Sequence, residues 1–159
     1  MILPDFMIRE LRVGDGRHVV EPWSERLVVS GMSAGLSHAG FDIRTKQGAR
    51  LAPGCFVLLS SIEHFVMPND CIATVKDKST WARRGLSVFN TILEPSWIGN
   101  LTIEVVNHGH QFIEILAGDP IAQIVFEQMA APPERPYRGK YNNQADEPVP
   151  ALREAFAAI

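Results

Sequence analysis

Residues 77–107 read DKSTWARRGLSVFNTILEPSWIGNLTIEVVN, and the rest of the chain is organised around this stretch. Ser79 is a residue type favoured at the start of helices and Gly85 is one favoured just past their ends, so a short helix is expected over residues 79–84. Ser79 and Arg83 lie four residues apart and would share one face of that helix. Free backbone N–H groups at the helix start, beside two basic side chains, suit a phosphate or another anion. A helix cap without further role is the alternative for Ser79.

The end of the same stretch predicts a strand that carries a carboxylate. Residues 101–106 read LTIEVV, so Thr102, Glu104 and Val106 would face one way and the aliphatic residues between them the other. A carboxylate on so apolar a strand is costly to bury without a partner, and burial would raise its pKa toward the range of a general acid or base. Two interpretations stay open for Glu104, namely a sheltered acid/base and an outward-facing residue on an edge strand.

Length and composition indicate one globular domain over residues 1–159, because 46% of the residues are hydrophobic. The net charge of -3 argues against a sequence-independent grip on nucleic acid, which needs a strongly basic surface. No apolar run is long enough to cross a bilayer and the N-terminus lacks a signal-peptide pattern, so we expect no membrane partner and a cytoplasmic location.

Cysteine and histidine usage predicts no zinc site. Cys55 and Cys71 both lie in apolar runs and are expected to be buried free thiols in a reducing compartment. The chain has no C-x-x-C pair and neither half of the zinc deaminase signature. The segment His108–His110 is best interpreted as a hairpin turn.

Turn residues recur about every ten positions after residue 48, which is typical of a β-sandwich, jelly roll or barrel. A short amphipathic helix is expected within residues 1–11, with Ile2, Phe6 and Leu11 packed against the body. The expected strands are 18–22, 26–30, 41–44, 55–59, 64–67, 71–75, 86–90, 101–106, 112–116 and 121–126.

The last part of the chain, residues 129–159, has a different character. It is rich in Pro, Gly and Asn and cannot build a core, so it either hangs free or closes over a site on this chain or on a neighbour. A short Ala-rich helix is expected within residues 148–159.

Six segments follow one another along the chain in a known order. They are Met1–Ile8 with the following VEP at 20–22, Ser37–Arg44, Ser79–Leu86, Glu94–Asn107, Ala117–Phe126 and Tyr137–Gln144. Together they resemble the dCTP deaminases, which belong to the trimeric dUTPase-like superfamily. The most specific part is STWARRGL, which is similar to the family's S-S-x-A-R-x-G-L. One such string would be weak support, whereas six in the right order are strong support.

The resemblance implies a mainly β fold, a distorted jelly roll or β-barrel, and hydrolytic removal of the cytosine 4-amino group from dCTP. Glu104 would be the general acid/base, and Ser79 and Arg83 would position the attacking water. Further substrate contacts are implied for Lys78, Thr80, Lys140 and Gln144 at the triphosphate, for Asn90, Thr91 and Glu94 near the nucleoside, and for Tyr137 and Tyr141 in a tail, 129–159, that closes over the site.

The resemblance also implies partners. Mg²⁺ would be held by the phosphate oxygens and not by protein side chains. The protein would be a homotrimer whose sites lie between subunits, with dCTP or dUTP as ligand and dTTP as a candidate inhibitor.

Several positions depart from the family pattern. The segment Ser87–Glu94 is shorter than usual, Glu94 and Ser96 replace Asp and Gly, and Lys78 replaces a common Arg. Two other functions are therefore kept beside dCTP deamination to dUTP. One is a dUTP pyrophosphatase or a bifunctional enzyme that forms dUMP, and the other is a non-catalytic nucleotide-binding protein. Glu104, Ser79 and Arg83 favour the deaminase.

Overall fold

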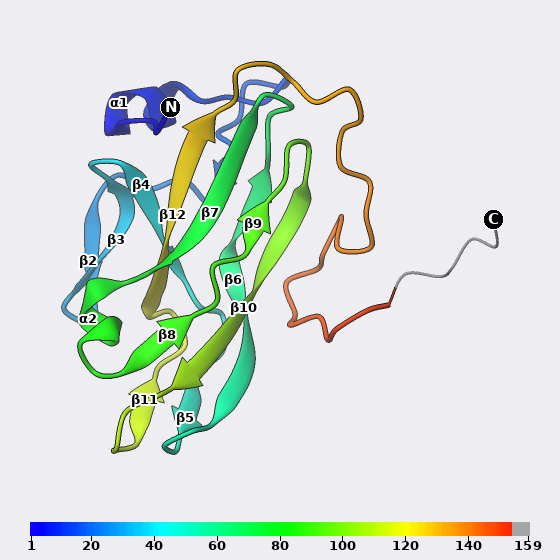
Figure 1. Cartoon of the computed structure of the whole chain (residues 1–159). Coiled ribbons are helices and arrows are strands. Elements are labelled where there is room, and N and C mark those ends of the chain that lie inside the picture. Colours follow the sequence, from blue (N-terminus) through cyan, green and yellow to red (C-terminus); the bar gives the residue numbers. More distant parts are fainter. Residues whose placement is uncertain (154–159) are drawn as a thin grey trace.

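The computed structural model describes residues 1–153, which form two short helices and twelve strands in three antiparallel sheets (Figure 1). The elements are α1 (Asp5–Glu10), β1 (Val20–Glu21), β2 (Leu27–Val29), β3 (Met32–Ser37), β4 (Gly40–Arg44), β5 (Ala49–Leu51), β6 (Phe56–Val66), β7 (Cys71–Asp77), α2 (Ser79–Ala82), β8 (Leu86–Val88), β9 (Ile92–Leu93), β10 (Ile98–Asn107), β11 (Ile113–Ile115) and β12 (Pro120–Gln128). The strand orders are β2-β3-β4-β12-β7-β9, β1-β6-β10-β8 and β11-β5. The mainly β architecture with two short helices is confirmed.

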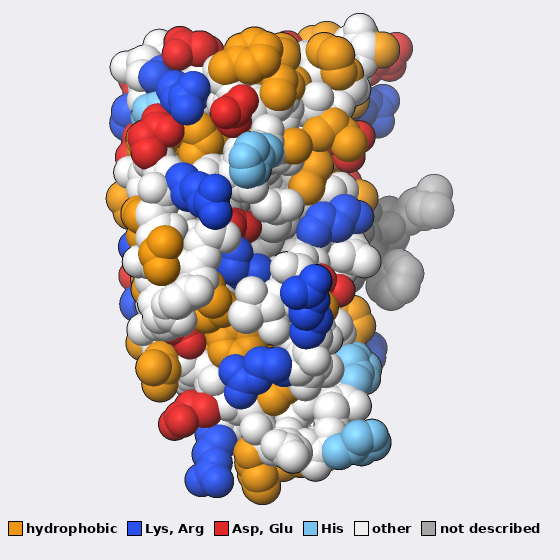
Figure 2. All heavy atoms as spheres, turned by 90° about the vertical axis from the view of Figure 1, so that its left-hand side faces the viewer, with side chains coloured by type: hydrophobic (Ala, Val, Ile, Leu, Met, Phe, Trp, Pro, Cys, Tyr) orange, Lys and Arg blue, Asp and Glu red, His pale blue; other side chains and the backbone are white. Residues whose placement is uncertain are grey.

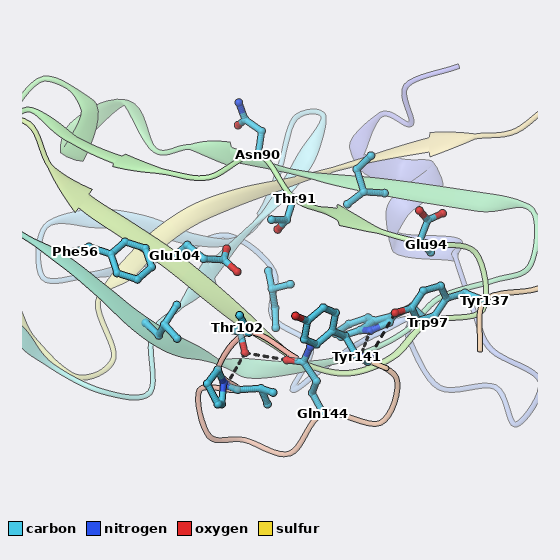
Figure 3. Close-up of a pocket in the computed structure, with 16 residues that line it drawn as sticks. Phe56, Asn90, Thr91, Glu94, Trp97, Thr102, Glu104, Tyr137, Tyr141 and Gln144 are labelled. Atoms are coloured by element: carbon cyan, nitrogen blue, oxygen red, sulfur yellow. Dashed lines mark hydrogen bonds between the residues drawn. The ribbon is translucent and has the colours of Figure 1, made fainter. Parts of the chain in front are cut away.

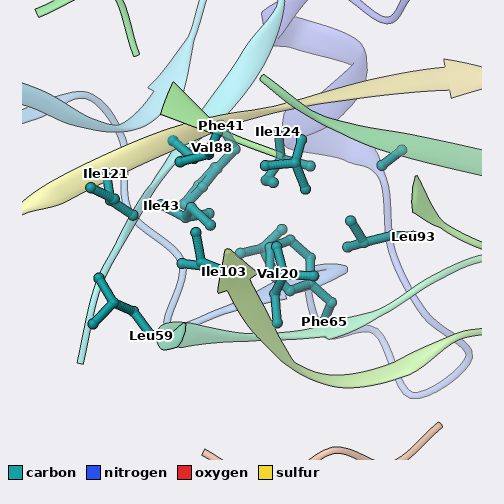
Figure 4. Packing of buried hydrophobic residues seen from close by; sticks show 14 of the residues in the cluster. Val20, Phe41, Ile43, Leu59, Phe65, Val88, Leu93, Ile103, Ile121 and Ile124 are labelled. Carbon is teal, nitrogen blue, oxygen red and sulfur yellow. The ribbon is translucent and has the colours of Figure 1, made fainter. Parts of the chain in front are cut away.

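The hydrophobic core lies between the two larger sheets (Figure 4). Phe41 on β4 and Ile124 on β12 come from the six-stranded sheet, and both are fully buried. Phe65 on β6 and Ile103 on β10 meet them from the four-stranded sheet. Two sheets that share one apolar layer make a sandwich-like body, and they leave the outer face of β10 free to build a site.

The N-terminal helix is shorter than expected and packs through other residues. It covers Asp5–Glu10, and Leu3 and Ile8 are buried while Ile2 and Phe6 are 55% and 60% exposed. The reason is that residues 1–3 are extended and bond to the end of β12, with the Leu3 N–H donating to the Phe126 carbonyl at 2.9 Å. In an extended segment adjacent side chains point to opposite sides, so Leu3 faces the core and Ile2 faces away.

Two strands expected at 55–59 and 64–67 are one long strand, β6. Ser60 and Ser61 interrupt the apolar pattern, yet both are fully buried. The Ser61 hydroxyl donates to the Glu63 carbonyl at 2.6 Å and accepts from the Leu101 N–H at 2.8 Å. Because these bonds satisfy the buried hydroxyl, polar residues continue the strand where sequence alone indicates a break.

Other differences concern short strands and turns. The strands β3, β5 and β9 were not expected from the sequence, because they are short or rich in small residues. The segment His108–His110 is not a hairpin turn, because β10 pairs with β6 and β8 while β11 pairs with β5. Cys55 is exposed, since it lies in the turn before β6, whereas Cys71 is buried and burial raises its pKa to about 11.

Residues 129–153 form no helix or regular strand and run past the edge of β10 (Figure 1). The isolated bridge between Gly99 and Gln144 is parallel and joins this tail to the start of β10. Most of the Ala-rich helix expected within 148–159 falls on residues 154–159, which lie outside the described part. Across residues 1–153, every helix is too short to span a membrane.

Candidate active site

A cavity of about 730 Å³ opens between the outer face of β10, the segment around β9 and the tail (Figure 3). Glu104 and Thr102 come from β10, Asn90 and Thr91 precede β9, and the tail contributes its residues from the third side. Phe56 and Leu58 of β6 line it as well, so segments far apart in the sequence meet around one hollow. A concave site of this size with a few polar groups suits a small ligand.

Glu104 lies on the wall of this cavity, half-buried, while its strand neighbours Ile103 and Val105 are in the core. Burial raises the pKa of the Glu104 carboxyl, and among the described residues no nearby cation lowers it again. The Glu104 carboxyl is therefore sheltered in the cavity and not fully exposed to solvent. Its cross-strand neighbour on β6 is the apolar Leu58, which adds to the low polarity around the carboxyl.

The loop between β8 and β9 is held close to Glu104 by backbone bonds. The Phe89 N–H donates to the Glu104 carbonyl at 3.1 Å, and the Val75 N–H on β7 donates to the Thr91 carbonyl at 3.0 Å. Between these two anchors lies Asn90, which also lines the cavity. The shortened loop thus presents Asn90 and Thr91 beside the carboxylate.

Two exposed aromatic residues flank this part of the site. Phe56 at the start of β6 and Phe89 in the loop are 55% and 52% exposed, and their rings make a T-shaped, edge-to-face pair with centroids 6.2 Å apart. Ile92 beside them is 50% exposed. An apolar group of this kind next to a half-buried carboxylate is unusual on a free surface.

The other end of the cavity is built by the turn before β10. Glu94 lies there close to Trp97 and Tyr137 (Figure 3), and the Trp97 N–H donates to the Glu94 carbonyl at 3.0 Å. Ser96 within this turn has a φ of 67°, the left-handed region in which glycine is favoured. The serine at this position therefore keeps the turn at some cost in backbone strain.

The tail covers the cavity with three of the residues expected there, Tyr137, Tyr141 and Gln144. Lys140 is exposed outside the cavity wall, with its ammonium 5.2 Å from the centre of the Tyr141 ring. The Trp97 indole N–H donates to the Tyr141 carbonyl at 2.6 Å, which fixes this part of the tail to the body.

The helix α2 lies apart from the cavity, between the end of β7 and the start of β8 (Figure 1). Ser79, Thr80 and Arg83 are exposed, and none of them lines the cavity of its own chain. The N-cap position is occupied by Lys78 and not by Ser79, which is the first helical residue. Figure 2 views this side of the molecule and shows Lys and Arg side chains gathered across the middle of the face. Such a surface attracts anions.

Two contacts fix the position of α2. The Trp81 indole N–H donates to the Pro120 carbonyl at 2.7 Å from a buried ring. Gly85 ends the turn with a φ of 88°, and a Cβ at Gly85 would lie 2.7 Å from the backbone nitrogen of Gly109. The helix is thus held rigidly although its polar face is free.

Lys78 is bound inside the chain. Its ammonium donates to Oδ2 of Asp42 at 2.8 Å and to the Ser33 hydroxyl at 2.9 Å, and the Lys78 and Asp42 side chains are 8% and 4% exposed. The other oxygen of Asp42 accepts from Nε2 of Gln123 at 3.2 Å. The ammonium expected at a phosphate therefore has its partners in the protein, directly before Ser79.

Breaking this ion pair should destabilise the fold. In Lys78→Met the Asp42 carboxylate stays buried without its cation, and we expect the free energy of unfolding to fall by about 3–5 kcal/mol. Urea unfolding at one fixed protein concentration measures the loss. The matched control is Lys46→Met, because Lys46 pairs with Asp146 at the surface and its loss should cost less than about 1 kcal/mol. Equal losses in the two variants would contradict the role given to burial.

Metal-binding side chains do not cluster in the described part of the chain: within residues 1–153 no group of three His, Cys, Asp or Glu residues could hold an ion. The carboxylates that line the cavity are Glu94 and Glu104, which come from its two ends. A metal at this site would need most of its ligands from a bound molecule.

Sequence reasoning did not single out Thr102 as a residue of the site. It lines the cavity on the same face of β10 as Glu104, and its hydroxyl contacts the tail. Its place two residues before Glu104 was the available signal.

Comparisons with known proteins agree with this architecture. The family model described as dCTP deaminase-like matches residues 10–129. The dCTP deaminase of Acidiphilium cryptum is 32% identical, over 95% of this chain and 99% of the relative. A dUMP-forming dCTP deaminase of Methanosphaera stadtmanae is 33% identical, over 67% of this chain and 58% of the relative.

Solved structures with the same fold include the dUTPase of phage phi11 of S. aureus, with a TM-score of 0.57 over 77% of this chain and 94% of the phage protein. At 15% sequence identity this likeness establishes the fold alone. The family model and the relative from Acidiphilium cryptum cover most of the sequence, and the residues matched include β10 and its cavity-facing carboxylate. The chain belongs to the dCTP deaminase family.

Proposed function

We propose that this protein catalyses the hydrolytic deamination of dCTP to dUTP and ammonia, with Glu104 as general acid/base. The observation that supports this most is the half-buried Glu104 carboxyl on the wall of the cavity, with a raised pKa and without a neutralising cation among the described residues. A carboxyl in this state takes and returns a proton more readily near neutral pH than an exposed one.

The reaction needs a proton shuttle and no redox step. Glu104 takes a proton from water as the water oxygen bonds to C4 of the cytosine, and delivers this proton to N3. It then takes the remaining proton from the C4 hydroxyl and delivers it to the 4-amino group, so that the C4–N bond breaks and ammonia leaves as C4 becomes a carbonyl. Ser79 and Arg83 position the water and stabilise the charge that develops.

Ser79 and Arg83 come to Glu104 from a neighbouring subunit in this proposal, and the protein is a homotrimer. The support is geometric. Both residues are exposed on α2, outside the cavity of their own chain. Phe56 on the cavity wall and Phe89, whose backbone N–H bonds to the Glu104 carbonyl, expose apolar surface that a second subunit would cover. A heterologous interface that closes into a ring would complete each site in this way.

The triphosphate would lie against the cationic face and the tail. Among residues 1–153, the Thr80 hydroxyl, the Lys140 ammonium and Nε2 of Gln144 have no hydrogen-bond partner and could donate to phosphate oxygens. Lys78 supports the helix start from within. Mg²⁺ would enter with the nucleotide and neutralise phosphate charge, held by phosphate oxygens. The base would be contacted by Asn90 and Thr91, and Glu94 with Tyr137 and Tyr141 would enclose the sugar end. Bound dTTP would occupy the same contacts as an inhibitor.

A second product is the candidate to test beside dUTP. The similarity to the dUMP-forming relative favours it, while Glu94, one methylene longer than the Asp that pyrophosphatases use, argues against it. The purified protein is incubated with Mg²⁺ and dCTP, dUTP or dCMP, and ammonia and pyrophosphate are measured. We expect ammonia from dCTP and no pyrophosphate. Pyrophosphate from dCTP would show that the protein is bifunctional. Pyrophosphate from dUTP alone would show that it is a pyrophosphatase. Nucleotide binding without either product would show that it is not catalytic.

A further inference from the structure

The tail docks on β10 as an added strand. The Asn143 N–H donates to the Ile98 carbonyl at 2.7 Å, and the Asn100 N–H donates to the Gln144 carbonyl at 3.0 Å. Gly99 and Gln144 form a parallel bridge between these two bonds. The first half of β10 has an edge that β8 does not cover, since β8 pairs only with residues 105–107, and the tail takes that edge.

The close approach of the two backbones depends on Gly99. Its φ is 146°, and a Cβ at this position would lie 2.7 Å from the Gln144 nitrogen. The glycine therefore allows the tail to reach β10 at Gln144, the residue whose side chain also contacts Thr102.

Thr102 makes two hydrogen bonds with its hydroxyl, and both go to the tail. The hydroxyl donates to Oε1 of Gln144 at 2.8 Å and accepts from the Val149 N–H at 3.0 Å. The residue is 7% exposed and lies on the cavity side of the strand that bears Glu104. Because Oε1 of Gln144 is engaged, its Nε2 remains as a donor without a partner among residues 1–153.

We propose that Thr102 is a positioning residue that latches the tail to the catalytic strand and orients the Gln144 carboxamide toward the nucleotide. The inference rests on the proposed function, because it assigns Gln144 a donor role toward an oxygen atom of that ligand. Glu104 and Thr102 are two residues apart on one strand, so the latch sets the tail against the same rigid element that sets the carboxyl.

The tail is a segment in which such a latch has a measurable effect. It has no regular structure and most of its side chains between residues 138 and 150 are partly or fully exposed, so its docking depends on a few hydrogen bonds. Some bonds are independent of Thr102, such as the one from the Ser60 hydroxyl to the Asp146 carbonyl at 2.9 Å. Loss of the Thr102 bonds should loosen the region from Gln144 to Val149 while the tail near Tyr141 stays attached to Trp97.

Three variants test the latch. Thr102→Val keeps the shape and removes both hydrogen bonds, Thr102→Ser keeps the hydroxyl, and Val149→Pro removes the tail donor without touching the body. Hydrogen exchange of peptides covering residues 142–149 is followed by mass spectrometry without nucleotide, and KM and kcat for dCTP are measured separately. Unfolding curves check that the body of each variant is folded.

In Thr102→Val we expect hydrogen exchange in residues 142–149 to be about tenfold faster. We also expect KM to rise about tenfold with a smaller change in kcat, because the apparent affinity for dCTP falls with the fraction of molecules whose tail is docked. Thr102→Ser should restore both values, and Val149→Pro should speed exchange in a body of normal stability. Unchanged exchange in both Thr102→Val and Val149→Pro, or a Thr102→Ser variant as loose as Thr102→Val, would overturn the latch. The exchange result stands whether or not the protein deaminates dCTP, so the two proposals fail separately.

Discussion

Glu104→Gln should abolish deamination and leave nucleotide binding largely intact. The amide fills the same space on the cavity wall but cannot take a proton from water, so kcat is expected to fall by about 10²–10⁴-fold. Ammonia release from dCTP measures kcat, and calorimetric titration with dCTP measures binding. The matched control is Glu114→Gln on β11, an exposed glutamate outside the cavity, which should keep its activity.

The same variant carries a second signature in its pH dependence. The Glu104 pKa is raised in the folded protein by burial, so the folded state holds its proton more tightly than the unfolded state. Stability of the wild type therefore decreases as pH rises through the window between the ordinary value of 4.5 and the raised value. Glu104→Gln has no ionisable group at this position and should be the more stable protein at neutral pH. Below pH 4.5 the free energies of unfolding of the two proteins should become equal. Full activity in Glu104→Gln would remove Glu104 from the mechanism.

Sequence patterns predicted the parts of the fold that depend on residues close together in the chain. The alternation of residues 101–106 predicted that Ile103 and Glu104 face opposite ways, and the structure has Ile103 in the core and Glu104 on the cavity wall. The parts of the fold that the sequence patterns did not predict depend on contacts between residues far apart in the chain. Ser60 and Ser61 continue β6 because partners elsewhere satisfy them, and Leu3 replaces Ile2 in the core because the N-terminus pairs with β12.

Some residues of the candidate site could likewise be predicted from the sequence, and others could not. The resemblance to the family singled out Asn90, Thr91 and Glu94, and all three line the cavity with Glu104. The role of Thr102 could not be read from its neighbours, because its partners lie more than forty residues later in the tail. Lys78 also looks like an exposed phosphate ligand in sequence, and only the fold brings Asp42 to it.

Mixing two inactive variants should restore activity if each site is shared between subunits. Arg83→Ala removes a charge that stabilises the transition state and should lower kcat by about 10²–10³-fold. A chain with Arg83→Ala still carries Glu104, and a chain with Glu104→Gln still carries Arg83. In a closed ring assembled at random from equal amounts, about a quarter of the interfaces join an intact Glu104 to an intact Arg83.

We therefore expect about a quarter of the wild-type activity from subunits mixed before assembly, compared with almost none from either variant alone. The control mixture combines Glu104→Gln with the double variant Glu104→Gln/Arg83→Ala. It forms the same assemblies, but none of its chains supplies Glu104, so it must remain inactive. If the test mixture stays as inactive as this control although mixed trimers are detected, Glu104 and Arg83 act within one chain. That result would require α2 to reach the cavity of its own subunit, which the buried anchors Trp81 and Lys78 oppose.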